Sequence, residues 1–497
     1  MRLTMLLDMA VDGFGDRVLV GRTVDGLTGV DLRARAVSGA LLLQERSATA
    51  LVYFAVNGPA FPVAMFAAAN AGIPLVPINY RLGTEQLAAL LAQHPGAIGI
   101  GDEQGLGHLS RAGISGLTPE EWLQTTTVDR GALSELDSAD NSPAIVIYTS
   151  GTTSAPKGVL LRHDNLVSYV LGSVEFGVAA ASDAALVSVP PYHIAAVANV
   201  ISNLFAGRRT LVLEQFRPEE WLDVARRERV TNALIVPTML SRIVECPADK
   251  SLPHLRGLAY GGAPMSSALI ERALRTWPDV GFVNAYGLTE TSSTVAVLGP
   301  DDHRAALASS DPSIRARLSS VGQVLPTIDI EIRDSDDRPL PPRTVGRICV
   351  RGEQVSAEYA GLGRAVDADG FFDTRDQGYL DEEGYLFIGG RVDDTIIRGA
   401  ENIAPSEIEE VLLRHPDVLD VAVIGVPDDE WGQRIEAVVV LRLGAEVGVA
   451  ELRAFAKVAL RSSKTPDHIR FWPELPRTET GKLVRRKVLD QVLSRTA

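Results

Sequence analysis

The sequence predicts an α/β protein that has a large N-terminal domain of mostly parallel, doubly wound sheets with a β subdomain, and a small α+β C-terminal domain. Three observations predict this class. Apolar runs alternate with helical segments up to about residue 285, which favours parallel strands joined by right-handed crossovers. Short alternating runs between Pro, Gly and Asp turns follow from about residue 319. A mixed segment of about 100 residues then ends the chain of 497 residues.

Residues 47–80 contain no charged side chain, which raises the question of a membrane span. Asn and Pro residues interrupt this stretch, so no apolar run reaches the ~20 residues that a spanning helix needs. The stretch is instead predicted to form a buried strand at 50–56, a helix at 61–70 and a second strand at 73–78. The first 140 residues carry no recognisable catalytic cluster and are interpreted as scaffold.

The middle of the chain predicts the sheet on which a site would form. In parallel α/β sheets, ligands gather beyond the carboxyl ends of the strands, so the turns that follow those strands are candidate site segments. The predicted strands lie at 185–189, 210–214, 232–236, 257–260 and 281–285, and the predicted helices at 197–205, 218–229, 239–244 and 266–277.

The pattern changes twice further along the chain. Short alternating runs predict an antiparallel β subdomain at about 319–392. A charged, glycine-led turn places a domain boundary at Asp393, which divides the chain into residues 1–392 and 393–497. The predicted β-subdomain strands are 328–333, 346–351 and 384–388; the predicted C-terminal elements are helices 405–413, 449–460 and 483–493 and strands 418–426, 434–441 and 469–472.

Composition narrows the classes of function. The net charge of −15 argues against a nucleic-acid binder, because neutralising phosphates requires a basic face. Cys246 and Cys349 have neither metal nor redox spacing and are interpreted as buried free thiols. The N-terminus lacks the basic and then apolar layout of a secretory signal, so a cytoplasmic location is expected.

A segment rich in Ser, Thr and Gly follows the apolar run 144–148 and ends at Lys157 and Gly158. Backbone N–H groups, hydroxyls and an ammonium can surround a polyphosphate, so this segment is a candidate nucleotide loop. Its lysine precedes the glycine, unlike the ordinary phosphate-loop motif. Taken alone, the segment also fits a surface turn, because these residue types favour turns for conformational reasons.

Small and polar residues also follow two of the predicted strands. Gly261 and Gly262 would let a flat ring approach the backbone. Tyr286 offers a face for stacking and Asn284 an amide for a base edge. Glu290 is a candidate ligand of Mg²⁺, which binds through one or two carboxylates and substrate phosphates. Each could be an ordinary turn residue, but their recurrence at successive strand ends favours a site.

These segments, in this order, resemble the superfamily of adenylate-forming enzymes, which includes acyl-CoA synthetases, nonribosomal-peptide adenylation domains and beetle luciferases. The resemblance implies that ATP and a carboxylic acid form an acyl-adenylate and pyrophosphate, after which the thiol of CoA displaces AMP. Mg²⁺ and oriented donors would stabilise the negative charge that develops in both steps. The matching blocks are 148–158, 286–290, 373–376, 390–391, 401–409 and 476–482.

The resemblance also implies roles for individual residues. Lys482 would bridge the acyl carboxylate and the α-phosphate, which Thr289 would also contact. Glu290 and Thr149 would hold Mg²⁺. The expected ATP and AMP contacts are Thr149, Ser150, Gly151, Thr152, Thr153, Lys157, Gly261, Gly262, Ala263, Asn284, Ala285, Tyr286, Gly287, Thr289, Asp376, Arg391 and Lys482.

In relatives the small domain rotates after adenylation, and Asp393 falls on the hinge position, so the C-terminal domain is expected to be mobile. His193 by itself fits a structural histidine, but it matches a residue that borders the acyl pocket of acyl-CoA synthetases and is included as a catalytic candidate. The expected acyl pocket contains His193, Gly261, Gly262 and Ala285, and the expected approach of CoA contains Arg398, Gly399, Ala400, Glu401 and Trp431.

Two residues depart from the family pattern. Arg375 stands beside the expected ribose ligand where the family commonly has glycine, and its role stays open. Ala400 replaces a frequent glycine near the expected thiol path. Lys482 is also a candidate target of a protein acetyltransferase, because its loop resembles a segment that such enzymes modify.

The leading hypothesis is an acyl-CoA synthetase that acts on a free carboxylic acid. The alternative is a stand-alone adenylating enzyme that loads a carrier protein or passes the acyl group to an amine. A non-enzymatic nucleotide-binding module would require Lys482 to be dispensable. Small apolar residues around the expected pocket favour an uncharged acyl or aryl tail. The sequence leaves open the chain length of the acid, the acceptor and the oligomeric state.

Overall fold

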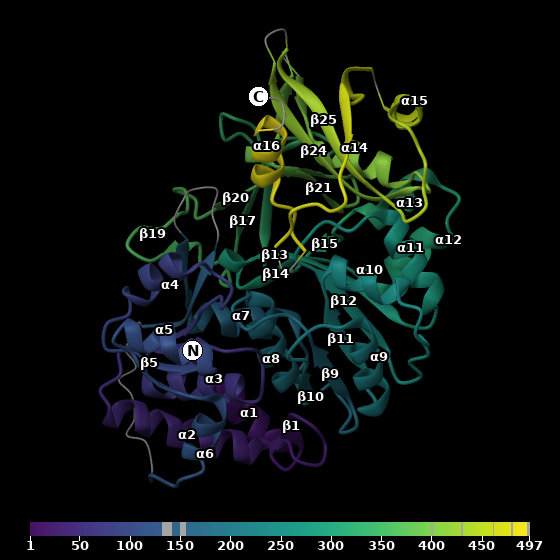
Figure 1. The fold of residues 1–497 in the computed structure, drawn as a ribbon. Coiled ribbons are helices and arrows are strands. Elements are labelled where there is room, and N and C mark those ends of the chain that lie inside the picture. The colour runs from purple at the N-terminus through teal and green to yellow at the C-terminus, as the bar shows by residue number, and fades with distance from the viewer. Residues whose placement is uncertain are drawn as a thin grey trace.

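A computed structural model places two large sheets and their helices below a smaller C-terminal part, and Figure 1 shows this arrangement. The expected α/β class is confirmed. No helix among the described residues is long and apolar enough to cross a membrane. Cys246 and Cys349 are buried free thiols, as expected. The structure describes residues 1–131, 142–149, 156–398, 401–428, 431–460, 462–478 and 481–494.

One large sheet has nine strands. They are β1 (Val18–Val20), β2 (Leu27–Thr28), β9 (Ala184–Val187), β10 (Arg209–Val212), β11 (Asn232–Ile235), β12 (Gly257–Gly261), β13 (Gly281–Leu288), β14 (Ser293–Leu298) and β15 (Gln323–Val324). Their order is β15-β14-β13-β12-β11-β9-β10-β1-β2. The six strands from β13 to β1 are parallel, and antiparallel strands close both edges. The carboxyl ends of the parallel strands therefore meet at one rim, as the alternating sequence pattern predicts.

The second large sheet has eight strands. They are β3 (Leu51–Phe54), β4 (Leu75–Pro77), β5 (Ile98–Gly101), β6 (Ser115–Leu117), β7 (Pro143–Thr149), β8 (Lys157–Arg162), β18 (Glu358–Tyr359) and β19 (Gly363–Arg364). Their order is β19-β18-β8-β7-β4-β3-β5-β6. The uncharged segment of the sequence forms β3, helix α3 (Ala60–Ala71) and β4, and these elements are largely buried, as predicted.

Helices cover these sheets and bury a continuous apolar core. Local signals fix several helix ends: the Thr28 side chain accepts a hydrogen bond from the N–H of Asp31, and left-handed Gly72 and Gly207 end two helices. The remaining helices of this part are α1 (Thr4–Phe14), α2 (Gly29–Glu45), α4 (Thr84–Leu91), α5 (Glu103–Arg111), α6 (Pro119–Thr125), α7 (His163–Ser173), α8 (Ile194–Ala206), α9 (Pro218–Arg227), α10 (Pro237–Glu245), α11 (Ser267–Thr276), α12 (Pro300–Ala308) and α13 (Pro312–Ala316).

The β subdomain is a four-stranded antiparallel sheet in the order β16-β17-β20-β21. Its strands are β16 (Asp329–Arg333), β17 (Gly346–Arg351), β20 (Phe372–Leu380) and β21 (Leu386–Arg391). Sequence patterning missed β20, because polar Thr374 and Asp376 take buried positions of the alternation and hide its apolar face. Strand β20 matters for the site, since it carries the expected ribose ligand.

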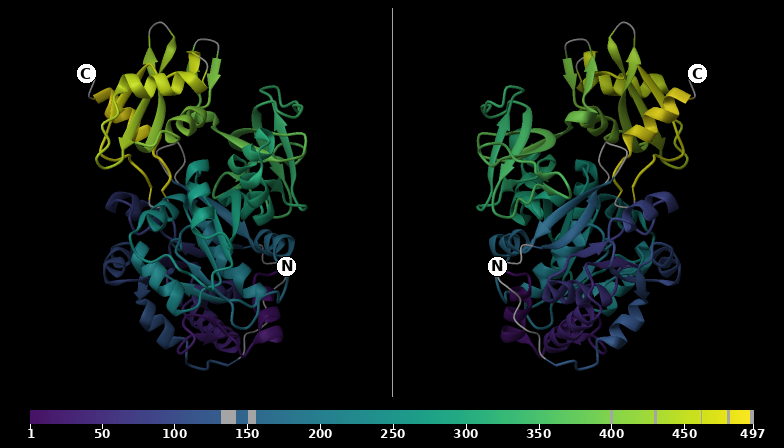
Figure 2. Two further views of the ribbon diagram at one scale, coloured as in Figure 1. Left: turned by 90° about the vertical axis from the view of Figure 1, so that its right-hand side faces the viewer. Right: turned by 90° about the vertical axis from the view of Figure 1, so that its left-hand side faces the viewer.

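The C-terminal part has its own apolar clusters, and Figure 2 shows it above the large part and next to the β subdomain. Strands β24, β25 and β26 form its sheet, with β22 and β23 as a separate hairpin. The boundary and hinge at Asp393 stay a prediction. The elements are β22 (Ile396–Arg398), β23 (Glu401–Ile403), α14 (Pro405–Leu413), β24 (Val418–Asp428), β25 (Gly432–Leu441), α15 (Val449–Ala459), β26 (His468–Phe471) and α16 (Arg485–Ser494).

Candidate active site

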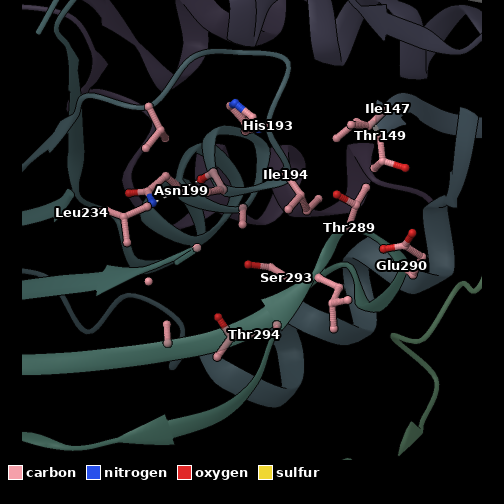
Figure 3. Close-up of a pocket in the computed structure, with 18 of the residues that line it drawn as sticks. Ile147, Thr149, His193, Ile194, Asn199, Leu234, Thr289, Glu290, Ser293 and Thr294 are labelled. Carbon is pink, nitrogen blue, oxygen red and sulfur yellow. Dashed lines mark hydrogen bonds between the residues drawn. The ribbon is translucent and has the colours of Figure 1, made fainter. Parts of the chain in front are cut away.

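A cavity of about 1030 Å³ lies at the carboxyl-end rim of the nine-stranded sheet and continues along the strands. Figure 3 shows Thr149, Thr289 and Glu290 at one end and Asn199 with Leu234 at the other. Many of the residues expected from the sequence share this one cavity. Those that line it are Thr149, Lys157, His193, Gly261, Gly262, Ala285, Gly287, Thr289, Glu290, Arg391, Asp393 and Lys482.

The expected phosphate loop is the connection of an antiparallel hairpin. Thr149 ends β7 and pairs with Lys157, which begins β8, and the Thr149 hydroxyl donates to the Lys157 carbonyl oxygen over 3.5 Å. The Lys157 ammonium lies 5.8 Å from the ring centre of Tyr359. The hairpin therefore brings a hydroxyl and a cation to the cavity. The expected contacts Ser150, Gly151, Thr152 and Thr153 lie outside the described residues.

Glu290 lies in a 3-10 turn, Thr289–Thr291, directly after β13. The Thr291 hydroxyl stabilises this turn by accepting from the N–H of Leu288. Tyr359, which the sequence analysis did not single out, donates its hydroxyl to Glu290 Oε1 over 3.0 Å. This contact fixes the carboxylate at the cavity wall, and its other oxygen accepts no hydrogen bond from the described residues.

The donor set at this end fits Mg²⁺. The described residues contain no group of three or more His, Cys, Asp or Glu side chains that could hold a metal ion by themselves. Mg²⁺ commonly binds one or two carboxylates and takes its other ligands from substrate phosphates and water. The Glu290 carboxylate and the Thr149 hydroxyl line the same cavity, so this end suits a metal that arrives with a nucleotide.

Asp376, the expected ribose ligand, is held by two neighbours. The Tyr286 hydroxyl donates to Asp376 Oδ2 over 2.7 Å, and Arg391 Nε lies 3.2 Å from Asp376 Oδ1. Burial raises the pKa of Asp376, and Arg391 opposes this shift. Burial and Asp376 raise the pKa of Tyr286 well above its usual value, so its hydroxyl remains a donor. This pairing links β13 to the β subdomain.

Tyr286 and Asn284 were expected to contact adenine. The wall of the cavity, as far as described residues form it, does not include Tyr286, Asn284, Ala263 or Asp376. The Asn284 amide donates to the Ser320 carbonyl oxygen over 3.1 Å. In this arrangement both side chains therefore make structural contacts, and their expected nucleotide contacts stay predictions.

Lys482 reaches the cavity from a tight C-terminal loop. The Thr478 N–H donates to the Lys482 carbonyl oxygen over 2.7 Å, and the Lys482 N–H donates to the Thr478 hydroxyl over 3.0 Å. The side chain keeps exposed surface because it projects into the open cavity, yet the protein around the ammonium removes much of its water. This desolvation, and then the nearby Arg391, lower the pKa of Lys482, while Asp376 and two further carboxylates oppose the shift.

His193 immediately precedes α8 and lines the middle of the cavity. Its ring centre lies 4.7 Å from that of Tyr192, which in turn makes an edge contact with Tyr80. Burial lowers the pKa of His193 to about 4, so the imidazole is neutral at pH 7. The histidine therefore offers a neutral ring that can donate or accept one hydrogen bond.

Arg398 and Trp431, two of the residues expected near CoA, lie together outside the cavity. Arg398 lies over the Trp431 ring at 5.1 Å from its centre. It also pairs with Asp467 at 2.9 Å. Gly399 and Ala400 lie outside the described residues, and Glu401 is described only as the backbone of β23. The structure thus joins Arg398 to Trp431, a pairing that the sequence did not predict.

Several lining residues escaped the sequence analysis because no motif marks them. Tyr359 of β18 is one of them and faces the nucleotide end, next to Arg375 of β20, to which the sequence assigned no role. Polar side chains at the opposite end also line the cavity, among them Asn199, Asn203 and Arg208. They belong to α8 and the turn after it, which an apolar helical pattern alone would assign to the core.

The fold and the cavity together define an adenylate-forming enzyme. The profile described as "AMP-binding enzyme" matches residues 7–360, and the profile described as "AMP-binding enzyme C-terminal domain" matches residues 407–482. The chain belongs to the AMP-binding enzyme family, within the adenylate-forming superfamily whose members include acyl-CoA ligases.

Named relatives cover nearly the whole chain. The fatty acid–acyl-carrier-protein ligase ScoC of Streptomyces coeruleorubidus is 32% identical over 448 residues, and the match covers 86% of this chain and 83% of ScoC. A feruloyl-CoA synthase of an Amycolatopsis species is 33% identical over 476 residues, and the match covers 92% of this chain and 91% of the synthase. The crystal structure of ATP-bound MatB from Rhodopseudomonas palustris superposes with a TM-score of 0.87 at 26% identity and covers 99% of both chains.

Proposed function

We propose that this protein activates a free carboxylic acid with ATP and Mg²⁺ to an acyl-adenylate and then transfers the acyl group to the thiol of CoA. The observation that carries the proposal is that Lys482, Glu290 and His193 line one cavity although they come from distant parts of the chain. A cation, a carboxylate for metal binding and an aromatic wall are the groups that acid activation requires at neighbouring positions.

The residues at the nucleotide end of the cavity each have a defined task in this proposal. Thr149 and Lys157 contact the phosphates that leave as pyrophosphate, and Glu290 with Thr149 would hold Mg²⁺, which neutralises phosphate charge when bound. Asp376 and Arg391 bind the ribose hydroxyls. Lys482 orients the carboxylate oxygen toward the α-phosphorus and stabilises the charge that develops there.

The second half-reaction needs the C-terminal part to move. Arg398 and Trp431 lie outside the cavity that contains Lys482, so a rotation about Asp393 would exchange the two sets of residues. The alternative acceptor is the phosphopantetheine of a carrier protein or an amine. Similarity to the acyl-carrier-protein ligase ScoC favours keeping the carrier protein as a candidate. The cytoplasmic location expected from the sequence stays a prediction.

One assay tests the proposal and separates the acceptors. The enzyme is incubated with ATP, Mg²⁺ and a panel of carboxylic acids, and release of pyrophosphate and AMP is measured with and without CoA. We expect acid-dependent pyrophosphate release, with sustained AMP release only when CoA is present. Turnover that never depends on CoA but responds to a carrier protein or an amine would assign the alternative.

A further inference from the structure

The cavity extends far beyond the nucleotide end. Gly257 and Gly261, the first and last residues of β12, both line it, so it follows this strand for about 13 Å. Leu234, Ala259 and Val283 provide an apolar wall along this path. The cavity therefore has room for an acid whose carboxylate lies near Lys482 and whose body extends toward the amino ends of the strands.

A guanidinium lies at the far end. Arg208, in the turn after α8, donates from Nη1 to Asn203 Oδ1 over 2.8 Å. Asn203 in turn donates to the backbone oxygen of Asn199 over 2.8 Å and to its side-chain oxygen over 3.1 Å. All three side chains line the cavity, and Figure 3 shows Asn199 beside Leu234 at the end opposite Glu290. This chain of hydrogen bonds fixes the position of the guanidinium.

The guanidinium of Arg208 forms no ion pair with a residue of the described chain. Its Nε is buried and makes no hydrogen bond there, and no described carboxylate forms an ion pair with it. Asp183 attracts the charge of Arg208 from nearby, but its ion pair is with Arg256, whose charge repels Arg208. Arginine stays charged in proteins, and a buried charge without an ion-pair partner costs free energy. Binding of an anion beside the guanidinium would therefore be favourable. The buried hydroxyl of Ser202, which also lines the cavity, likewise has no hydrogen-bond partner within the part of the chain that the structure describes.

A structural role explains only part of this arrangement. A cation after the last turn of α8 interacts favourably with the negative end of the helix dipole. That role does not require Arg208 to line a cavity, and it leaves Arg208 Nε and the Ser202 hydroxyl buried without a hydrogen-bond partner among the described residues. A ligand in the cavity with oxygen acceptors at its far end would satisfy both groups.

We propose that the substrate is a dicarboxylic acid with an apolar body, whose second carboxylate pairs with Arg208. The inference rests on the proposed function and names its substrate class. One carboxylate oxygen forms a bond to the α-phosphorus of ATP while the bond from that phosphorus to the pyrophosphate oxygen breaks. The second carboxylate stays unreacted and accepts hydrogen bonds from Arg208 and Ser202.

This inference changes the substrate expected from the sequence. The small apolar residues considered there favour an uncharged tail, and they do line the middle of the cavity, as Ala285 and Gly261 illustrate. The charge at the far end comes from Arg208, which no motif marks and which reaches the cavity only through the path of α8 along the sheet.

The test compares linear monocarboxylic and α,ω-dicarboxylic acids of equal carbon number by acid-dependent pyrophosphate release. The wild-type protein should show a higher kcat/KM for the diacid than for the matched monoacid, roughly 10- to 100-fold at the best length, as charge-assisted hydrogen bonds contribute. Arg208→Gln should remove this preference while kcat/KM for monoacids changes less than about threefold. Arg208→Lys should restore part of it, because it keeps the charge but not the two-pronged geometry.

A matched control is Arg275→Gln, which removes an exposed arginine of α11 and should leave kcat/KM for both acids unchanged. Calorimetric binding of the two acids to the wild-type protein gives a result that does not depend on any variant folding. The inference would be overturned if the wild-type kcat/KM for monoacids equals or exceeds that for diacids, or if Arg208→Gln lowers kcat/KM equally for both acids. Either result would leave the proposed function intact. Absence of pyrophosphate release with every acid would overturn both.

Discussion

The guanidinium Nη1 of Arg375 lies 3.8 Å from Oδ2 of Asp393, so a residue of β20 contacts the predicted hinge. Arg375 has a φ of +60°, a left-handed conformation that glycine adopts without strain. Position 375, where the family pattern commonly has glycine, thus has the backbone conformation typical of glycine while it carries a charged side chain. Both side chains are substantially exposed, which limits the energy of the pair.

We expect Arg375→Gly to change the free energy of unfolding by less than about 1 kcal/mol, because relief of strain offsets both the lost pair and the added freedom of the unfolded chain. Arg375→Val should instead destabilise the protein by about 1–3 kcal/mol, since a β-branched residue is strained at this φ. Urea unfolding measures both. A larger loss in the glycine variant than in the valine variant would contradict the backbone explanation.

Lys482→Ala should abolish pyrophosphate release while ATP binding, measured by calorimetry, survives. Since the pKa of Lys482 is lowered, kcat/KM for ATP should fall with rising pH, and this fall should begin below the pH at which an ordinary lysine loses its proton.

Acetylation of Lys482 by a protein acetyltransferase should have the same effect as the substitution, because it removes the charge. Intact-mass measurement that shows acetylated Lys482 with an unchanged rate would exclude this regulation.

Gly481, next to Lys482, tests whether the C-terminal loop must dock on the large part. It has a φ of +76°, and a Cβ there would lie 2.3 Å from the side chain of Thr238 on α10. We expect Gly481→Ala to lower acyl-adenylate formation at least about tenfold, because a displaced lysine loses its alignment. Thioester formation from a supplied acyl-adenylate should fall much less. Equal losses in both half-reactions would argue against a docking role specific to adenylation.

His193 should make stability depend on pH in mildly acidic solution. Its pKa in the folded protein is about 4, so between that value and the ordinary value the unfolded chain binds more protons. The contribution is fully present above about pH 6.5 and is lost as the pH falls toward 4, by at most about 3 kcal/mol. His193→Gln should flatten this part of the stability curve.

His94 and His303 also have pKa values lowered by burial and will keep some acid sensitivity in that variant. The comparison is therefore between the slopes of wild-type and His193→Gln unfolding free energies against pH. Identical slopes would contradict the burial of a neutral His193. The activity profile adds a second check, since a neutral histidine should produce no step in kcat/KM between pH 5 and 8.

Much of the fold and of the nucleotide end could be predicted from the sequence, for a local reason. The helix at 405–413 and the strand at 346–351 match α14 and β17, because their apolar periods and turn residues are contiguous in the chain. Thr289 and Glu290 likewise follow β13 directly, so their place at a strand end could be inferred from the pattern alone.

Only the tertiary structure decided which distant residues meet. Tyr286 bonds to Asp376, Tyr359 to Glu290, and Arg208 comes to the end of a cavity that begins near Lys482. The class of chemistry, activation of an acid, could be predicted from the sequence by itself, because the groups expected to perform it lie in short contiguous motifs. The selectivity inferred for the acid depends on side chains brought together by long-range packing, and no local pattern encodes such a contact.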